Sequence, residues 1–254
     1  MEYHNFILNS YFHEDVIDMK SVADELLTKY KLISKYLIDT DNFINDLCLK
    51  GGVVFEGAQG TMLDIDHGTF PYVTSSNTTL SGLVSGTGVN MSLVNYGLGI
   101  TKAYSTRVGH GPFPSELKND IGERIGEIGG EIGATTGRTR RCGWLDTKVL
   151  KKSIRLNNLS GIALTKIDVL DNFDEISICV DYGKIDYESF AVEDLKFIKL
   201  PGWKSSTVGI TNYDDLPKNA KLYIETIEEL VQIPIDIIST GPARDEIIQK
   251  TNIF

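Results

Sequence analysis

Four short apolar runs set the strongest limit on the fold of this chain. They occupy residues 98–104, 161–164, 176–180 and 233–238. Several of them are nearly continuous in apolar residues, as expected for strands of a sheet that is covered on both faces. The segments 145–156 and 216–231, which lie between the runs, have the three- and four-residue apolar spacing of helices. This alternation predicts an α/β fold.

The first fifty residues have a different pattern. From position 16 to 49, apolar residues recur at three- and four-residue steps among charged residues, without a proline, which predicts one or two amphipathic helices. At Gly51 the residue pattern changes. The apolar residues 53–55 predict a buried strand that leads into a long polar loop. Without a repeat or a linker, we expect one unit over 1–254, in which residues 1–50 are helical and residues 51–254 form the α/β sheet portion.

Charge and cysteine content narrow the range of partners. The 254 residues carry a formal net charge of −10, which argues against broad binding of nucleic acid or anionic membranes. No apolar run has the length of a membrane span, and the first residues lack a signal-peptide pattern. The three cysteines, Cys48, Cys142 and Cys179, have neither disulfide-framework nor zinc-site spacing. These features predict a protein of the reducing cytoplasm.

A cationic loop is the first candidate site. Arg138, Arg140 and Arg141 lie within four residues of one another, directly after two threonines and Gly137. Guanidinium groups bind carboxylates and phosphates in a bidentate manner, so this loop predicts an anionic ligand. The alternative is an ordinary loop of solvated surface charges.

Two polar segments follow predicted strands. Lys166 and Asp168 follow the run 161–164, and a Lys-x-Asp pair at a strand end is typical of guanine recognition, in which the carboxylate accepts from the base. The small residues 239–241 follow the run 233–238, where backbone N–H groups of an α/β sheet can approach a ligand. Structural strand ends and an ordinary turn are the competing interpretations.

A third group, Asp64, Asp66 and His67, has the side chains of a hard-metal site, although a hydrogen-bond network within the loop explains it equally well. The sequence contains no GxxxxGK[ST], GxGxxG or HExxH motif. It therefore shows no phosphate-binding loop of its own.

Taken together, six strings resemble the adenylosuccinate synthetase family, in the same order along essentially the whole chain. They are FEGAQGTMLDIDHGTFPYVTSSNTT (55–79), KAYSTRVGHGPFPSEL (102–117), GATTGRTRRCGWLD (133–146), LTKIDVLD (164–171), LPGW (200–203) and PIDIISTGP (234–242). The resemblance implies a central, mainly parallel sheet flanked by helices, which this chain holds in incomplete form. It also implies a homodimer.

The resemblance implies a reaction as well. Members join inosine monophosphate to aspartate with GTP and Mg²⁺, and they release adenylosuccinate, GDP and phosphate. The γ-phosphoryl group of GTP passes to the 6-oxygen of the purine, and the amine of aspartate then displaces it.

By the same resemblance, residues of this chain receive binding roles. Inosine monophosphate is assigned to Gln59, Thr74 and Arg138. Aspartate is assigned to Ala134, Thr135, Thr136, Gly137, Arg138, Thr139 and Arg140. GTP is assigned to Arg140, Lys166, Ile167, Asp168, Ser239, Thr240 and Gly241. Many members carry an arginine where Thr139 stands, so we expect weaker aspartate binding here.

The family's phosphate loop WGDEGKGK, with its catalytic aspartate, and the histidine of its GHT motif are absent from the sequence. The resemblance places these strings, and most Mg²⁺ ligands, upstream of the matching region. We therefore assign no catalytic residue or metal ligand and expect the chain alone to be inactive, since phosphoryl transfer depends on positioning and charge stabilisation. A truncated gene model, an incomplete gene and a split enzyme all fit this pattern.

Two other functions compete with a synthetase portion. One is a viral-type relative that acts on a guanine nucleotide or a deoxynucleotide, and the other is a non-catalytic nucleotide-binding or complementing subunit. In every case an incomplete sheet predicts an exposed edge and uncovered apolar surface, including some of the helical surface within 16–49.

Overall fold

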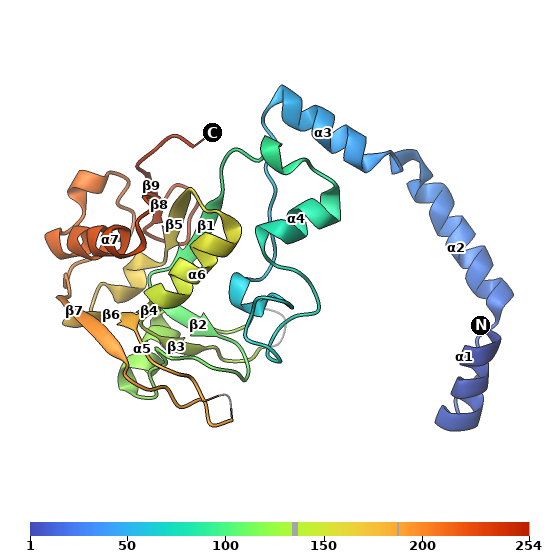
Figure 1. The fold of residues 1–254 in the computed structure, drawn as a ribbon, viewed down its shortest axis with the longest axis horizontal. Coiled ribbons are helices and arrows are strands. Elements are labelled where there is room, and N and C mark those ends of the chain that lie inside the picture. The colour runs from blue at the N-terminus through green and yellow to red at the C-terminus, as the bar shows by residue number, and fades with distance from the viewer. Residues whose placement is uncertain (134–136, 187, 254) are drawn as a thin grey trace.

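The computed structural model describes residues 1–133, 137–186 and 188–253, which form three successive regions (Figure 1). Residues 1–50 are an extended series of helices, here called the arm. Residues 98–249 contain the sheets and their covering helices, here called the core. Residues 51–97 connect the two and are called the connecting segment.

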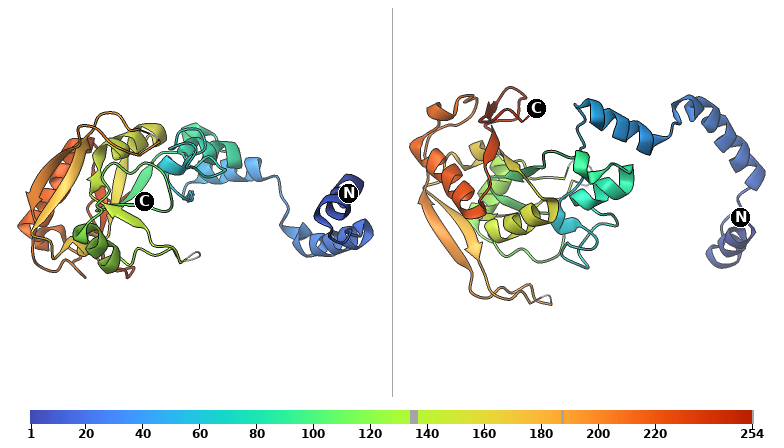
Figure 2. Two further views of the ribbon diagram at one scale, coloured as in Figure 1. Left: turned by 90° about the horizontal axis from the view of Figure 1, so that it is seen from below. Right: turned by 45° about the horizontal axis from the view of Figure 1, so that its top comes forward.

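The arm is helical, as the sequence predicts. Its helices are α1 (Glu2–Ile7), α2 (Met19–Ile33) and α3 (Thr40–Lys50), with a π-helical turn at Leu8–Phe12 and a 3-10 turn at Ser34–Tyr36. The Asp18 side chain caps α2 by accepting hydrogen bonds from the backbone N–H groups of Lys20 (3.3 Å) and Ser21 (2.9 Å). The arm has no buried residue, and it projects away from the core in both views of Figure 2. The expectation of uncovered helices is confirmed.

The main sheet has four strands in the order β1-β5-β8-β9. They are β1 (Leu98–Lys102), β5 (Gly161–Thr165), β8 (Ile235–Ser239) and β9 (Ile247–Gln249). The first three are parallel and only β9 runs antiparallel among these strands. Lys102 pairs with Thr165 and Leu164 pairs with Ile238, so the carboxyl ends of three parallel strands meet at one edge.

Two smaller sheets complete the core. In one, β2 (Ser105–Arg107) pairs antiparallel with β3 (Arg141–Gly143). In the other, β6 (Glu175–Asp181) pairs parallel with β4 (Leu145–Asp146) and antiparallel with β7 (Lys196–Pro201). The covering helices are α5 (Asp120–Ile128), α6 (Thr147–Asn157) and α7 (Lys218–Val231), and short 3-10 turns occupy Ile167–Leu170 and Tyr213–Asp215. The predicted mixed α/β fold with a mainly parallel sheet is confirmed.

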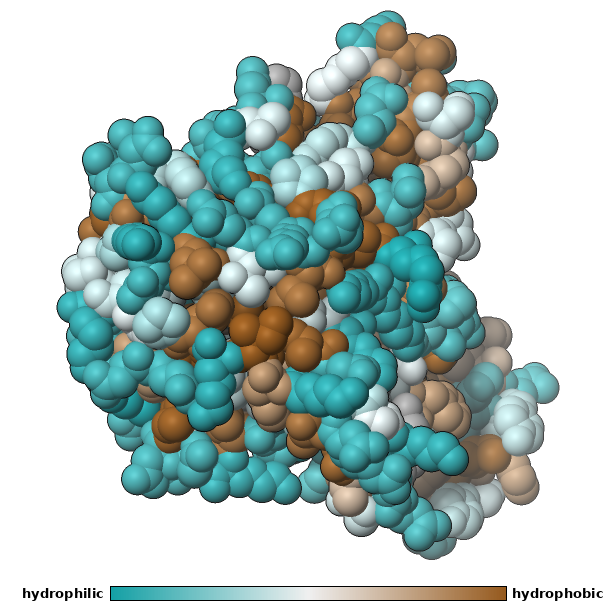
Figure 3. Space-filling model, turned by 60° about the vertical axis from the view of Figure 1, so that its left-hand side comes forward, coloured by the Kyte–Doolittle hydropathy of each residue, from teal (hydrophilic) through white to brown (hydrophobic). Residues whose placement is uncertain are grey.

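Helix α7 shows how periodicity becomes packing. Its residues Ala220, Tyr223, Ile224 and Ile227 share one face and are fully buried in the core. The Tyr223 hydroxyl donates a 2.5 Å hydrogen bond to the carbonyl of Ala103, just beyond β1, which satisfies its one buried polar group. Figure 3 shows the side of the core, where hydrophilic residues surround smaller groups of hydrophobic ones.

The connecting segment corrects one prediction. Residues 53–55 form no strand, and the Val54 side chain is 73% exposed. A strand is stable only when a neighbour satisfies its backbone groups, and no described residue pairs with this run. The segment instead contains 3-10 turns at Thr61–Leu63 and Met91–Leu93 and helix α4 (Leu80–Thr87).

Contacts with α6 fasten the connecting segment to the core. Asn157 accepts a 2.8 Å hydrogen bond from the backbone N–H of Leu80 and donates a 3.0 Å bond to the Thr61 hydroxyl. Lys152 donates a 2.7 Å bond to the carbonyl of His67. Among the described residues, no helix has the length and apolar character needed to cross a membrane.

Candidate functional site

The carboxyl edge of the main sheet collects residues from distant regions of the sequence. Lys102 ends β1, Lys166 follows β5 directly, and Ser239 ends β8. Because β1, β5 and β8 are neighbours and parallel, the segments that follow them emerge on the same side. The structure thus brings together the two segments, 166–168 and 239–241, to which guanine recognition is assigned.

The turn at 166–168 is held in a defined conformation. Lys166 has a left-handed backbone (φ 60°), and its amine donates to the Gly129 carbonyl at 2.5 Å and to Glu131 at 3.1 Å. Ile167 is fully buried, so its side chain belongs to the core and only its backbone can reach a ligand.

Asp168 is a partly buried carboxylate in the same turn. Burial raises its pKa above the ordinary value, and the charges of Asp171 and Glu246 raise it further, while its own backbone N–H and Lys166 act in the opposite direction. A carboxylate in such a place gains from a ligand that offers it paired N–H donors.

The turn after β8 is tightly built. Thr240 is fully buried, and its hydroxyl donates to the carbonyl of Ile210 at 2.9 Å, while the Ser239 hydroxyl donates to the carbonyl of Gly241 at 2.9 Å. A Cβ at Gly241 would lie 2.2 Å from a Glu246 carboxylate oxygen, so a larger residue here would push this flexible acidic side chain away from the turn. The Thr240 hydroxyl is therefore engaged with a carbonyl outside the turn.

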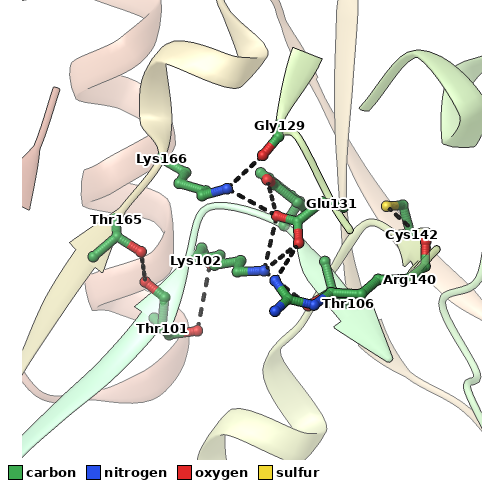
Figure 4. A network of polar contacts seen from close by, with 10 residues as sticks. Thr101, Lys102, Thr106, Gly129, Glu131, Arg140, Cys142, Thr165 and Lys166 are labelled. Carbon is green, nitrogen blue, oxygen red and sulfur yellow. Dashed lines mark hydrogen bonds and ion pairs between the residues drawn. The ribbon is translucent and has the colours of Figure 1, made fainter. Parts of the chain in front are cut away.

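A buried carboxylate lies beside this edge, and sequence reasoning missed it. Glu131 is fully buried, and the Lys102 amine donates to both of its oxygens at 2.8 Å. Arg140 donates to it at 2.8 Å (Figure 4). The Tyr104 hydroxyl also donates to it, at 2.5 Å. Burial alone would raise its pKa, yet these donors lower it to about 2.

The signals for this cluster are weak in the sequence. Lys102 and Tyr104 are separated by two positions at a strand end, which places them on the same side. Glu131 stands among glycines, and nothing in that spacing indicates an ion pair. Burial lowers the pKa of Lys102, although Glu131 opposes the change.

Two arginines of the cationic loop bind two different carboxylates. Ala134, Thr135 and Thr136 lie outside the described residues. Gly137 has φ 63°, and Thr139 bridges Ile132 across the loop. Arg140 binds Glu131, whereas Arg141 binds Glu116 through two bonds of 2.5 and 2.6 Å. The backbone carbonyl of Arg138 accepts from the N–H of Gly133 at 2.8 Å.

Gln59 and Thr74, both assigned to inosine monophosphate, are in direct contact. The Gln59 amide donates to the Thr74 hydroxyl at 2.9 Å and accepts from Ser76 at 3.2 Å. Gln59 also has a left-handed backbone (φ 68°), a strained conformation for a residue other than glycine. The two residues therefore form one polar unit on the connecting segment.

Asp64 supports the hydrogen-bond interpretation of its loop. The fully buried carboxylate accepts backbone N–H bonds from Asp66 (3.0 Å), His67 (2.9 Å) and Thr78 (2.6 Å). Burial opposes its charge, but these donors hold its pKa below the ordinary value. Within residues 1–133, 137–186 and 188–253, no three His, Cys, Asp or Glu side chains form a group able to hold a metal.

A mainly parallel sheet with basic and acidic side chains at its carboxyl edge defines an α/β protein, and in open α/β sheets ligands bind at that edge. Residues 1–248 match the family model described as adenylosuccinate synthetase. The chain belongs to this family.

Individual relatives agree with the family match. The chain is 52% identical to an adenylosuccinate synthetase of a Psychrobacter species, over 98% of this chain and 60% of that protein. It is 51% identical to the Edwardsiella ictaluri protein of the same name, over 100% of this chain and 61% of that protein. The chain thus spans about 60% of the length of the curated relatives it matches.

Solved structures support the same fold. A fully ligated adenylosuccinate synthetase from Plasmodium falciparum superposes with a TM-score of 0.87 at 35% identity, covering 98% of this chain and 62% of that one. A cyanophage S-2L succinoaminodeoxyadenylate synthetase has a TM-score of 0.53 at 16% identity, covering 85% of this chain and 51% of that one. The second likeness concerns the fold alone.

Proposed function

We propose that this chain carries the ligand-binding residues of an adenylosuccinate synthetase, which joins inosine monophosphate to aspartate with GTP and Mg²⁺ and releases adenylosuccinate, GDP and phosphate. One observation carries the proposal. The parallel neighbours β5 and β8 bring Lys166, Asp168 and the turn 239–241 to one edge of the main sheet.

The chemistry of that edge suits guanine. The Asp168 carboxylate accepts from the ring N–H and the exocyclic amine, and the lysine stem at position 166 covers the face of the base. Adenine presents a ring nitrogen acceptor where guanine presents N–H, so it would leave the carboxylate without its donor and bind more weakly. Backbone groups of Ile167 and of residues 239–241 border the same place.

The other two ligands are assigned to neighbouring segments. The guanidinium groups of Arg138 and Arg140, with the loop residues 134–139, bind the carboxylates of aspartate. Gln59 and Thr74, together with Arg138, bind inosine monophosphate, with Gln59 near the 6-position of the purine. The contact between Gln59 and Thr74 supports this assignment because it orients both side chains together.

The transfer step needs further groups. The sequence contains no GxxxxGK[ST] loop to surround the phosphates of GTP, and the described residues hold no group of metal-binding side chains. The described residues therefore do not fit a Mg²⁺ site, and no step is assigned to the ion within this chain. We propose that turnover requires a polypeptide with the family's phosphate loop and GHT histidine. A cytoplasmic homodimer stays a prediction from the sequence.

A binding experiment tests the guanine site on the pure chain. GDP and ADP are titrated against the wild type, Asp168→Asn and the control Asp174→Asn, whose exposed carboxylate pairs with Lys204 at 2.6 Å. We expect preference for GDP and a loss of about tenfold or more in Asp168→Asn, because an amide replaces one acceptor by a donor. The control keeps the wild-type affinity. Equal affinity for both nucleotides in the wild type would contradict the proposal.

A turnover experiment tests the need for further groups. GDP and adenylosuccinate are measured after mixing GTP, inosine monophosphate, aspartate and Mg²⁺ with the chain, alone and with a segment of a family member that contains WGDEGKGK and GHT. We expect product only in the mixture. Steady turnover by the chain alone would refute that requirement, and silence in both would leave at most a nucleotide-binding protein.

A further inference from the structure

The Glu131 cluster joins two segments that receive different ligands. Arg140 belongs to the segment assigned to aspartate and is itself also assigned to GTP, and Lys166 belongs to the turn assigned to guanine. Both side chains end on the same carboxylate, at 2.8 Å and 3.1 Å (Figure 4). Glu131 is thus a direct physical link between the two proposed sites.

The side chains of the cluster differ in their exposure to solvent. The Glu131 side chain is 0% exposed, whereas those of Lys102, Arg140 and Lys166 are 24%, 31% and 36% exposed. The carboxylate therefore lies on the inside and the three cations lie on the outside. Three cations outnumber one carboxylate, so the open side of the cluster keeps a net positive charge that favours an anionic ligand.

The anchoring of Glu131 is stronger than an ion pair on the surface. Tyr104, itself buried, donates to Glu131 at 2.5 Å, and the backbone N–H of Arg140 donates to the Glu131 carbonyl at 2.8 Å. Lys166 is fixed a second time by the Gly129 carbonyl, two positions before Glu131. A buried and fully hydrogen-bonded carboxylate of this kind holds its partners in one geometry.

Resting on the proposed function, we propose that Glu131 is a positioning residue that holds Arg140 and Lys166 in fixed relation, so that the aspartate and guanine sites are aligned with each other. Glu131 does not contact a ligand. It acts through the two side chains that do, and Lys102 completes the cluster by occupying both carboxylate oxygens from the end of β1.

The test compares Glu131→Gln with Glu116→Gln. Glu116 is a suitable control because it also makes a close two-bonded ion pair, with Arg141, in the same region of the core. GDP affinity is measured for the wild type and both variants, after circular dichroism has shown that each is folded. We expect affinity to fall about tenfold or more in Glu131→Gln, as for a displaced binding group, and to be unchanged in Glu116→Gln.

A second readout separates positioning from a general loss of structure. The pKa of the Lys102 amine is followed by nuclear magnetic resonance on lysine-labelled protein. Burial lowers the pKa of Lys102, and the charge of Glu131 opposes that change. We therefore expect the Lys102 pKa to fall further in Glu131→Gln and to stay unchanged in Glu116→Gln. Glu131→Asp keeps the negative charge but shortens the side chain by one methylene. We therefore expect the pKa of Lys102 to fall less in Glu131→Asp than in Glu131→Gln, while GDP binding is still weakened.

The outcomes distinguish the two proposals. If the wild type does not bind GDP, the proposed function is overturned, and so is the positioning role of Glu131 that rests on it. A wild type that binds GDP, with equal affinity in Glu131→Gln, overturns only the positioning role. If Glu131→Gln does not fold, Glu131→Asp is compared with Glu116→Asp, and equal GDP affinity in these two variants overturns the positioning role.

Discussion

The arm and the core are built from similar helices with different surroundings. Helix α2 in the arm and helix α7 in the core have 15 and 14 residues, and both repeat apolar residues at helical spacing. Five residues of α7 are buried and none of α2 is. Local sequence therefore decides that a segment is helical, whereas burial depends on whether another element lies against its apolar face.

The same contrast holds for charged side chains. In the arm, Glu25 and Lys29 form an exposed ion pair one helical turn apart. In the core, Glu131 is fully buried and has four donors from three separate segments. Water and salt weaken an ion pair that lies in solvent. A buried carboxylate stays ionised only because its hydrogen-bond and ion-pair partners offset the cost of removing its charge from water.

The largest expected difference comes from removing apolar volume. Ile224→Ala in α7 should lower the free energy of unfolding by about 2–5 kcal/mol, because a cavity is left in the core. Leu27→Ala in α2, where the side chain is 58% exposed, should change it by less than about 0.5 kcal/mol. Urea unfolding of both variants checks the pair. A similar cost at Leu27 would show that the arm is covered in solution, for example by a second copy.

The next difference concerns acid. The pKa of Glu131 is about 2, below its ordinary value of 4.5, so its contribution to stability is present above pH 4.5 and is lost as the pH falls toward 2. By linkage this contribution is about 3 kcal/mol at neutral pH. In unfolding experiments the stability gap between the wild type and Glu131→Gln should keep its full size at neutral pH and shrink as the pH falls from 4.5 toward about 2. A stability gap at Glu131 that does not change with pH would contradict the assigned pKa.

The smallest difference concerns helix caps. Asn119 caps α5 by accepting from the backbone N–H groups of Ile121 and Gly122, as Asp18 caps α2 in the arm. Asn119→Ala should cost about 1 kcal/mol of core stability, measured by thermal unfolding. Asp18→Ala should reduce helix content by circular dichroism and leave the unfolding midpoint of the core unchanged. A lowered midpoint would mean that the arm and the core unfold together.

Much of the core could be predicted because its strands are nearly continuous in apolar residues. The runs 161–164 and 176–180 lie within β5 and β6. Strand β7 was not predicted, because at this sheet edge its side chains alternate between exposed and half-buried positions. The error at 53–55 has the opposite cause, since an apolar run alone cannot supply the partner strand that it needs.

The candidate site also contains residues that the sequence could predict and one that it could not. Lys166, Asp168 and the turn 239–241 could be predicted, because polar residues directly after apolar strands collect at one edge of a parallel sheet. Glu131 could not, because its role depends on three cations that lie 29 residues before it and 9 and 35 residues after it in the chain. Only the tertiary fold brings such residues together.

The strand order also limits how the molecule can form. Strand β5 occupies the middle of the parallel sheet, yet its partners β1 and β8 begin 63 residues before it and 74 residues after it. Closing loops of this length before any pairing energy is gained is slow compared with helix formation. During synthesis the arm can become helical as soon as it emerges, whereas the site edge cannot form until Ser239 has been added. Newly made chains therefore pass through a period in which helices exist and the carboxyl edge of the main sheet does not.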